Sequence, residues 1–214
     1  MMQIQNYHVS YGQSKVLHGL EFEVNPGEIV ALVGRNGMGK TTLMKSLMGI
    51  VPATQGKMLL NNEDMTGFLS HERVSRGVAY VPQGRMIFPT MTVEENIETG
   101  LAASNRKTIP DEIYDLFPVL KEMRTRHGGN LSGGQQQQLA IARALVSEPK
   151  VLLLDEPTEG IQPSIIKELA QVLKRIRDER GLSILVSEQV LSFVMDASDR
   201  IMVIENGRIV HEDN

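Results

Sequence analysis

The stretch GRNGMGKT, residues 34–41, has residue types and spacing that suit phosphate binding. Its glycines let backbone N–H groups turn inward, and the helix that follows points the positive end of its dipole at the same place. In this pattern a lysine reaches the terminal phosphates and a threonine hydroxyl binds Mg²⁺. The alternative is a glycine-rich turn that binds nothing. We predict a nucleotide cradle made of Gly34, Arg35, Asn36, Gly37, Met38, Gly39, Lys40, Thr41 and Thr42.

Two adjacent carboxylates follow the apolar run VLLL. Asp155 is placed to hold the Mg²⁺ shell beside Thr41, and Glu156 is placed to orient or deprotonate an attacking water. By itself the pair also fits a solvated turn before Pro157. The phosphate cradle favours the catalytic interpretation, so we predict phosphoryl transfer from a nucleotide to water.

The segment LSGGQ, residues 131–135, precedes a helical pattern. Ser132 is a good helix N-cap, and Gly133 and Gly134 expose N–H groups that attract an anion. One chain has little use for a second cradle, whereas two chains facing head to tail can each close the site of the other. The glutamines at 136–138 are expected to form a solvated helix face.

These motifs resemble those of ATP-binding-cassette (ABC) ATPases, and the resemblance covers nearly the whole chain. It implies that Ser132, Gly133, Gly134 and Gln135 touch the γ-phosphate bound by the opposite subunit. It also implies three partners: a second, related ATPase in a head-to-tail dimer, a pair of transmembrane permease subunits and, indirectly, a periplasmic binding protein.

Other family positions can be assigned by resemblance. Tyr11 matches the aromatic residue that stacks on adenine, with a sheet tyrosine as the alternative. Gln83, in YVPQGR, matches the glutamine that senses Mg²⁺ and the attacking water. Two positions depart from the family pattern: Gln189 replaces a histidine and carries no charge at any pH, and Gln162 replaces an aspartate at the subunit interface.

The strands and helices that position these residues are expected to form an α/β fold. Alternating β segments open the chain, and the later order of strands and helices predicts a mostly parallel sheet. We predict one ABC ATPase domain of the P-loop NTPase class over residues 1–214. Residues 1–92 and 148–214 would form the catalytic core with an antiparallel β part. Residues 93–147 would form a helical subdomain that includes LSGGQ at 131–135, the signature segment of the family.

Composition excludes several classes. A formal net charge of −4 disfavours nucleic acid, and zero Cys excludes disulfides and thiolate metal sites. An ABC ATPase that acts on DNA or ribosomes would usually carry a second cassette, a long coiled coil or basic arms. No apolar run reaches the roughly 18 residues that cross a bilayer. We therefore expect the protein to remain in the cytoplasm unless a partner holds it at a membrane. The resemblance to ABC ATPases implies such a partner and a peripheral position on the cytoplasmic face of the inner membrane.

The stretches YVPQGRMIFPTMTVEENI, SGGQQQQLAIARAL and DEPTEGIQPSIIKEL resemble ATPases of the branched-chain amino acid and urea importer group. The last two are most similar to a urea importer ATPase, so the resemblance implies urea as cargo and branched-chain amino acids as the alternative. The two substituted glutamines leave a third interpretation, a nucleotide-binding regulatory subunit with little turnover.

Overall fold

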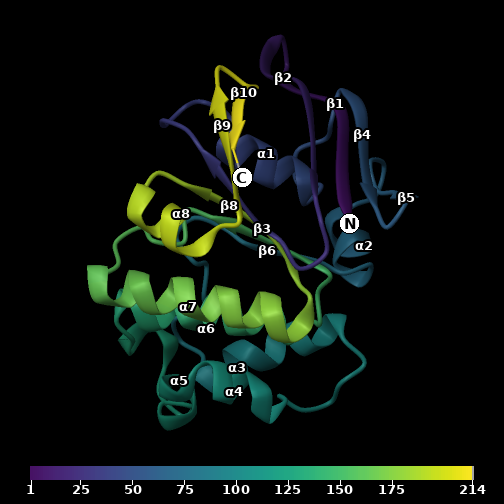
Figure 1. Ribbon diagram of the computed structural model, residues 1–214. Coiled ribbons are helices and arrows are strands. Elements are labelled where there is room, and N and C mark those ends of the chain that lie inside the picture. Colours follow the sequence, from purple (N-terminus) through teal and green to yellow (C-terminus); the bar gives the residue numbers. More distant parts are fainter. Residues whose placement is uncertain (214) are drawn as a thin grey trace.

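The computed structural model describes residues 1–213, which form two sheets and the helices that pack on them (Figure 1). The smaller sheet is antiparallel, with the order β2-β1-β4-β5. In β1 the apolar side chains largely alternate with polar ones, so one face packs on the core. The strands are β1 (Met2–Tyr11), β2 (Ser14–Val24), β4 (Gln55–Leu60) and β5 (Glu63–Asp64).

The larger sheet has the order β10-β9-β3-β8-β7-β6, and all its pairs are parallel except β9–β10. Its central strands are continuous apolar runs because helices or the second sheet cover both faces. The predicted α/β class, with a mostly parallel core sheet and an antiparallel addition, is confirmed. The strands are β3 (Ile29–Val33), β6 (Val78–Val81), β7 (Val151–Asp155), β8 (Ser183–Glu188), β9 (Arg200–Glu205) and β10 (Arg208–Asp213).

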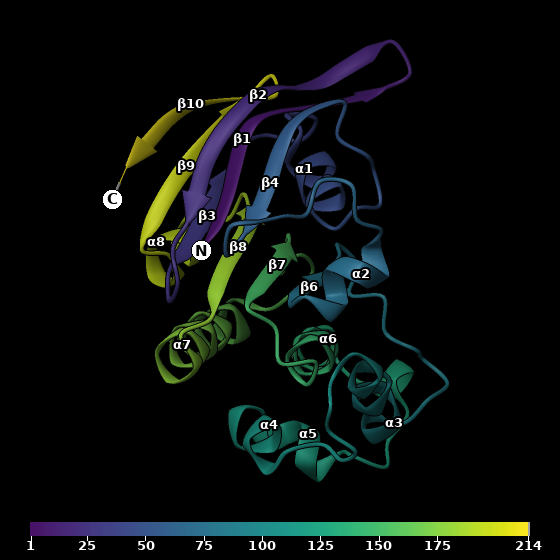
Figure 2. The ribbon, with the colours of Figure 1, turned by 90° about the vertical axis from the view of Figure 1, so that its right-hand side faces the viewer.

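The core consists of two apolar clusters, one on each face of the parallel sheet. Helix α1 (Lys40–Leu47) belongs to one cluster and contacts strands of both sheets, and Figure 2 shows it beside β1 and β4. Helices α6 (Gly133–Leu145) and α7 (Pro163–Arg180) cover the other face. Helix α7 begins with a proline and ends at Gly181 in the left-handed conformation, as such signals predict.

Short helices fill the segment between β6 and α6, and Figure 2 shows them at the end of the molecule remote from the antiparallel sheet. Two prolines interrupt the helical pattern: Pro110 is the N-cap of α4, and Pro118 is the first residue of α5. The remaining elements are α2 (Ser70–Ser75), α3 (Val93–Glu98), η1 (Thr99–Ala103), α4 (Asp111–Leu116), α5 (Pro118–Glu122), η2 (Gly128–Asn130) and α8 (Leu191–Ala197).

The predicted solvated glutamine face is wrong for two of its residues. Gln137 and Gln138 are 3% and 5% exposed, because this side of α6 faces the core and α7. The Nε2 of Gln138 donates to Glu168 of α7 at 3.3 Å, whereas the Nε2 of Gln137 is buried without a partner among the described residues. Over residues 1–213, no helix is long and apolar enough to cross a membrane.

Candidate functional site

The loop between β3 and α1 forms the predicted cradle. Gly37 and Gly39 have φ of 82° and 107°, a left-handed conformation that side chains disfavour. At Gly34 a Cβ atom would lie 2.6 Å from the carbonyl oxygen of Ile204, so only glycine fits there. These glycines therefore allow the loop to turn tightly against β9.

The cradle encloses a cavity of about 330 Å³. Lys40 is 4% exposed, and its Nζ donates to the carbonyl oxygens of Gly34 and Arg35 at 2.6 and 3.3 Å. Met38 turns toward the β9–β10 turn, where its Sδ accepts from the N–H of Asn206 at 3.3 Å. The cavity is lined by Val16, Asn36, Gly37, Gly39, Lys40, Thr41, Thr42, Gln83 and Glu156.

Asp155, at the end of β7, is 1% exposed and accepts hydrogen bonds from three hydroxyl groups. Thr41 Oγ1 and Ser187 Oγ donate to its Oδ1 at 3.3 and 2.5 Å, and Tyr80 Oη donates to its Oδ2 at 3.3 Å. Burial, together with the charge and hydrogen bond of Asp155, raises the pKa of Tyr80 above its usual range, so this hydroxyl stays a donor. Hard oxygen donors of this kind fit Mg²⁺, with Thr41 and Asp155 as the residues that would hold it.

Ser187 and Tyr80 are site residues that the sequence analysis missed. Each lies in a strand that pairs in parallel with β7, at or next to the carboxyl end, so strand register brings it beside Asp155. A search for polar residues at the ends of the predicted parallel strands would have found both.

Glu156 is the point where three elements meet. Its Oε1 lies 3.3 Å from Lys40 Nζ and accepts from Gln189 Nε2 at 2.8 Å, and its Oε2 accepts from Gln83 Nε2 at 3.4 Å. The second N–H of the Gln189 amide donates to Asn36 Oδ1 at 2.7 Å. Residues from three separate stretches of sequence thus surround the Glu156 carboxylate, in an arrangement that suits a group placed to activate water.

The backbone of Glu156 is also strained. Its φ of 48° lies in the left-handed region, where a residue with a side chain persists only if its neighbours hold it. Such strain is common at functional sites. The N–H of Glu156 donates to the carbonyl oxygen of Ser187 at 2.9 Å, which fastens this residue to β8.

Two predicted groups lie outside this cavity. Tyr11 ends β1 with 49% of its surface exposed. Ser132 caps α6: its Oγ accepts from the Gln135 N–H at 3.3 Å, and Gln135 Oε1 accepts from the Ser132 N–H at 2.9 Å. Gly133 and Gly134 form the first turn of α6 behind this cap, away from the phosphate cradle of the same chain.

Gln162, at the interface position of the family pattern, is the N-cap of α7 and makes no side-chain cap hydrogen bond. Its side chain is exposed. The segment that carries it lies against the start of α6, because a Cβ atom on Gly134 would lie 2.7 Å from Ile165 Cγ2.

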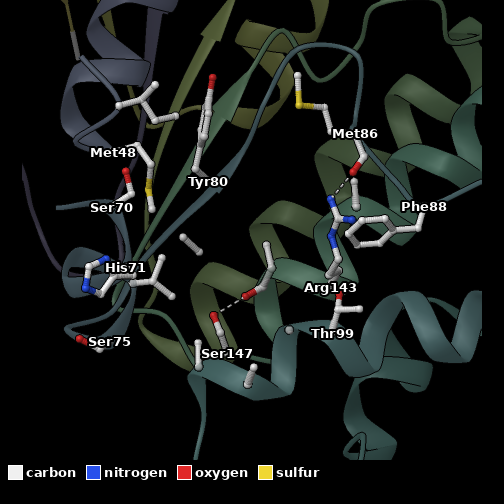
Figure 3. A pocket seen from close by; sticks show the side chains of 18 residues that line it. Met48, Ser70, His71, Ser75, Tyr80, Met86, Phe88, Thr99, Arg143 and Ser147 are labelled. Carbon is white, nitrogen blue, oxygen red and sulfur yellow. Dashed lines mark hydrogen bonds between the residues drawn. The ribbon is translucent and has the colours of Figure 1, made fainter.

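A larger cavity of about 720 Å³ lies between α2, β6, α6 and the loop of residues 82–92, which we call the Gln83 loop (Figure 3). Arg143 of α6 extends along it beside Phe88, with its guanidinium carbon 5.4 Å from the ring centre. Its Nη2 donates to the carbonyl oxygens of Met86 and Arg85 at 2.8 and 3.3 Å. Arg85 and Met86 both have positive φ, so Arg143 holds the Gln83 loop in a strained conformation.

Comparisons with known proteins identify the family of this chain. A family model described as ABC transporter matches residues 17–159. The chain is 39% identical over 216 residues to the high-affinity branched-chain amino acid transport ATP-binding protein BraG of Pseudomonas aeruginosa, covering 100% of this chain and 92% of that protein. It is 34% identical over 212 residues to the lipopolysaccharide export system ATP-binding protein LptB of Haemophilus influenzae, covering 96% and 87%.

Solved structures have the same fold. An ATP-binding cassette of an ABC transporter in its ADP conformation superposes with a TM-score of 0.87 at 28% identity, covering 100% of this chain and 91% of that one. A dimeric cassette in a post-hydrolysis state, bound to ADP and Pi, gives a TM-score of 0.89 at 23% identity, covering 100% and 98%.

The chain belongs to the ABC transporter family, as one of its ATP-binding subunits. Within that family it is similar to the ATPases of branched-chain amino acid transporters, and its activity is ATP hydrolysis coupled to transport. The predicted ABC ATPase family, fold class and enzyme class are confirmed, whereas a role in urea transport stays a prediction. The individual site residues and the domain boundaries stay predictions.

Proposed function

We propose that this chain is the energy-coupling subunit of an importer and that Glu156 is its water-activating base. The observation that supports this most is the convergence of Lys40, Gln83 and Gln189 on the Glu156 carboxylate, inside a cavity lined by the phosphate cradle. In this proposal the cradle residues bind the phosphates, with Lys40 at the β- and γ-phosphates.

Mg²⁺ would be held by Thr41 and Asp155, with Gln83 close to its shell. When bound, Mg²⁺ neutralises phosphate charge. Gln189 keeps Glu156 aimed into the cavity through its bonds to Glu156 and Asn36. Hydrolysis then rests mostly on positioning and on electrostatic stabilisation of the transferred phosphoryl group.

The signature residues supply a second half of the site in a head-to-tail dimer. Ser132, Gly133, Gly134 and Gln135 would contact the γ-phosphate held by the opposite cassette, and Tyr11 would stack on adenine. Their position outside the phosphate cavity of their own chain supports this arrangement. The opposite cassette is proposed to be a related but different ATPase.

The larger cavity is proposed to receive a cytoplasmic segment of a transmembrane permease. Met86, Phe88 and Ile50 line it with 68%, 46% and 54% of their surfaces exposed, which is unusual for large apolar side chains that lie together. Permease movement would reach Glu156 through the Gln83 loop. In this proposal the chain lies on the cytoplasmic face of the inner membrane, with the periplasmic binding protein on the far side.

Branched-chain amino acids are the proposed cargo, on the basis of the relatives that act in their transport. Urea is the second candidate, because the stretches at 132–145 and 155–169 resemble those of urea importer ATPases. An ATPase subunit does not contact the solute, so cargo has to be tested in cells.

The experiment is uptake of labelled leucine and labelled urea at low concentration by cells with and without this gene. Complementation uses the parent gene, a Lys40→Ala copy and a Lys45→Ala control from the same helix. Loss of leucine uptake alone, rescued by the parent and by Lys45→Ala but not by Lys40→Ala, supports the proposal. Loss of urea uptake alone moves the cargo to urea, and unchanged uptake of both contradicts both cargo proposals.

A further inference from the structure

The last residue of β8, Glu188, is a buried carboxylate to which the proposed hydrolysis assigns no role. It is 2% exposed, and within residues 1–213 no Lys, Arg or His forms an ion pair with it. Burying a carboxylate is costly unless hydrogen bonds replace its water. The groups that bind Glu188 therefore indicate what it stabilises.

Four donors bind Glu188, and they come from two different loops. Its Oε1 accepts from the Thr158 N–H at 2.9 Å and from Thr158 Oγ1 at 2.6 Å. Its Oε2 accepts from the N–H groups of Gln189 and Val190 at 2.8 and 3.2 Å. One oxygen thus holds the loop after β7, and the other holds the loop after β8.

Each of these loops carries a residue of the hydrolytic site. Glu156 lies two positions before Thr158, and Gln189 follows Glu188 directly. The two side chains meet at 2.8 Å, between Gln189 Nε2 and Glu156 Oε1. Because the backbone of Glu156 is strained, with φ of 48°, this meeting depends on neighbours that fix both loops.

We propose that Glu188 is a positioning residue for ATP hydrolysis. Its carboxylate joins the loops of Glu156 and Gln189, so that these two side chains stay in contact when the phosphate cavity changes its contents. Glu188 does not line that cavity. The inference rests on ATP hydrolysis and is independent of the transported solute.

Variants at both ends of the contact test the proposal. Glu188→Gln keeps the size of the side chain but replaces one acceptor oxygen by an NH₂ group, which cannot accept from the two donors that it faces. Thr158→Val removes the Oγ1 donor, and Thr158→Ser retains it. We expect kcat to fall about tenfold in Glu188→Gln and several-fold in Thr158→Val, with Thr158→Ser close to the parent. Nucleotide affinity should stay within about twofold, because the cradle is untouched.

The double variant Glu188→Gln/Thr158→Val separates positioning from general damage. If the two residues act as one unit, its kcat falls little further than that of Glu188→Gln alone. Multiplied losses would overturn the proposal, as would a parent-like kcat in Glu188→Gln. Glu205→Gln, at the exposed end of β9, is the matched control and should leave kcat unchanged.

Amide hydrogen exchange on the nucleotide-free protein gives a readout that does not need turnover. We expect faster exchange in Glu188→Gln at both 156–160 and 189–191, and parent rates in β4. Parent rates at either loop would overturn the proposal. A parent protein without ATP hydrolysis would instead contradict the assigned activity, and the exchange data would still decide whether Glu188 joins the loops.

Discussion

Two helices of this molecule begin at glycine-rich segments, and they begin in different ways. Helix α1 follows Gly39, which has no side chain and makes no cap hydrogen bond. Helix α6 follows Ser132, whose hydroxyl and N–H are both paired with Gln135. The first turn of α1 therefore leaves its N–H groups for a ligand, whereas α6 already satisfies part of its own first turn.

The difference indicates two kinds of anion site. The α1 site is assembled within one chain, with Lys40 buried beside the loop and Glu156 across the cavity. The α6 site offers the N–H groups of Gly133 and Gly134 and has a stable cap before any ligand arrives. We expect the first to bind nucleotide in an isolated chain and the second to act only when another cassette brings a nucleotide to it.

The largest effect is expected from removing the positive charge of Lys40 at the α1 site. Lys40→Ala should lower nucleotide affinity and ATP hydrolysis by at least about 100-fold, because the proposed charge-assisted contacts of Lys40 to the β- and γ-phosphates would be lost. Fluorescent nucleotide titration and phosphate release measure the two effects. Lys45→Ala, in the last turn of the same helix, should behave as the parent. Tight nucleotide binding by Lys40→Ala would contradict the expectation that the α1 site binds nucleotide in an isolated chain through Lys40.

A second test gives the α1 site a titratable group. In Gln189→His the imidazole gains a proton near pH 6.5, and the resulting cation beside Glu156 makes this carboxylate a weaker base. Hydrolysis relative to the parent should therefore be about threefold lower at pH 6 than at pH 8. Gln55→His, at the exposed start of β4, is the control. A ratio that is constant with pH would show that residue 189 has no influence on Glu156.

A third test addresses the cap of α6. Ser132→Ala should lower the free energy of unfolding by about 1 kcal/mol and Tm by roughly 2–4 °C. Thr92→Ala removes the same kind of capping box from α3 and should cost a similar amount. Only Ser132→Ala should also lower hydrolysis by the paired cassettes, about fivefold, with nucleotide affinity of the single chain unchanged. Equal hydrolysis in both variants would mean that the α6 start is structural only.

The smallest test concerns the interior of α6. Gln137→Met keeps the volume of the side chain and removes a buried amide N–H₂ group that has no partner among the described residues. Thermal unfolding should show Tm higher by about 1–3 °C. Gln136→Met should not raise Tm, because Gln136 Nε2 donates to Gly128 O at 3.2 Å. A fall in Tm for Gln137→Met would contradict this account.

The α1 site could be predicted from the sequence because its residues are close together in the chain. GRNGMGKT contains the loop and the first helical turn, and the apolar run before it predicts a buried strand. The parallel sheet was predictable for a similar reason, since β3, β7 and β8 are short apolar runs bounded by turns.

The contacts around Asp155 and Glu188 could not be predicted in the same way. Tyr80 and Ser187 reach Asp155 through the register of parallel strands that are far apart in the sequence, and Thr158 reaches Glu188 from the loop after β7. The burial of Gln137 and Gln138 likewise depends on how α6 packs against the core and α7, which a run of four glutamines does not reveal.

Helix α6 also connects the signature segment at its first turn to the Gln83 loop, which Arg143 in its last turn contacts. Gly133 and Arg143 are about 15 Å apart along its axis, at 1.5 Å per residue. A tilt of about 5° at the signature end would move the guanidinium of Arg143 by about 1.3 Å, enough to break a hydrogen bond. The strained Gln83 loop, which Arg143 holds by two carbonyl oxygens, must therefore either travel with the helix or be released from it.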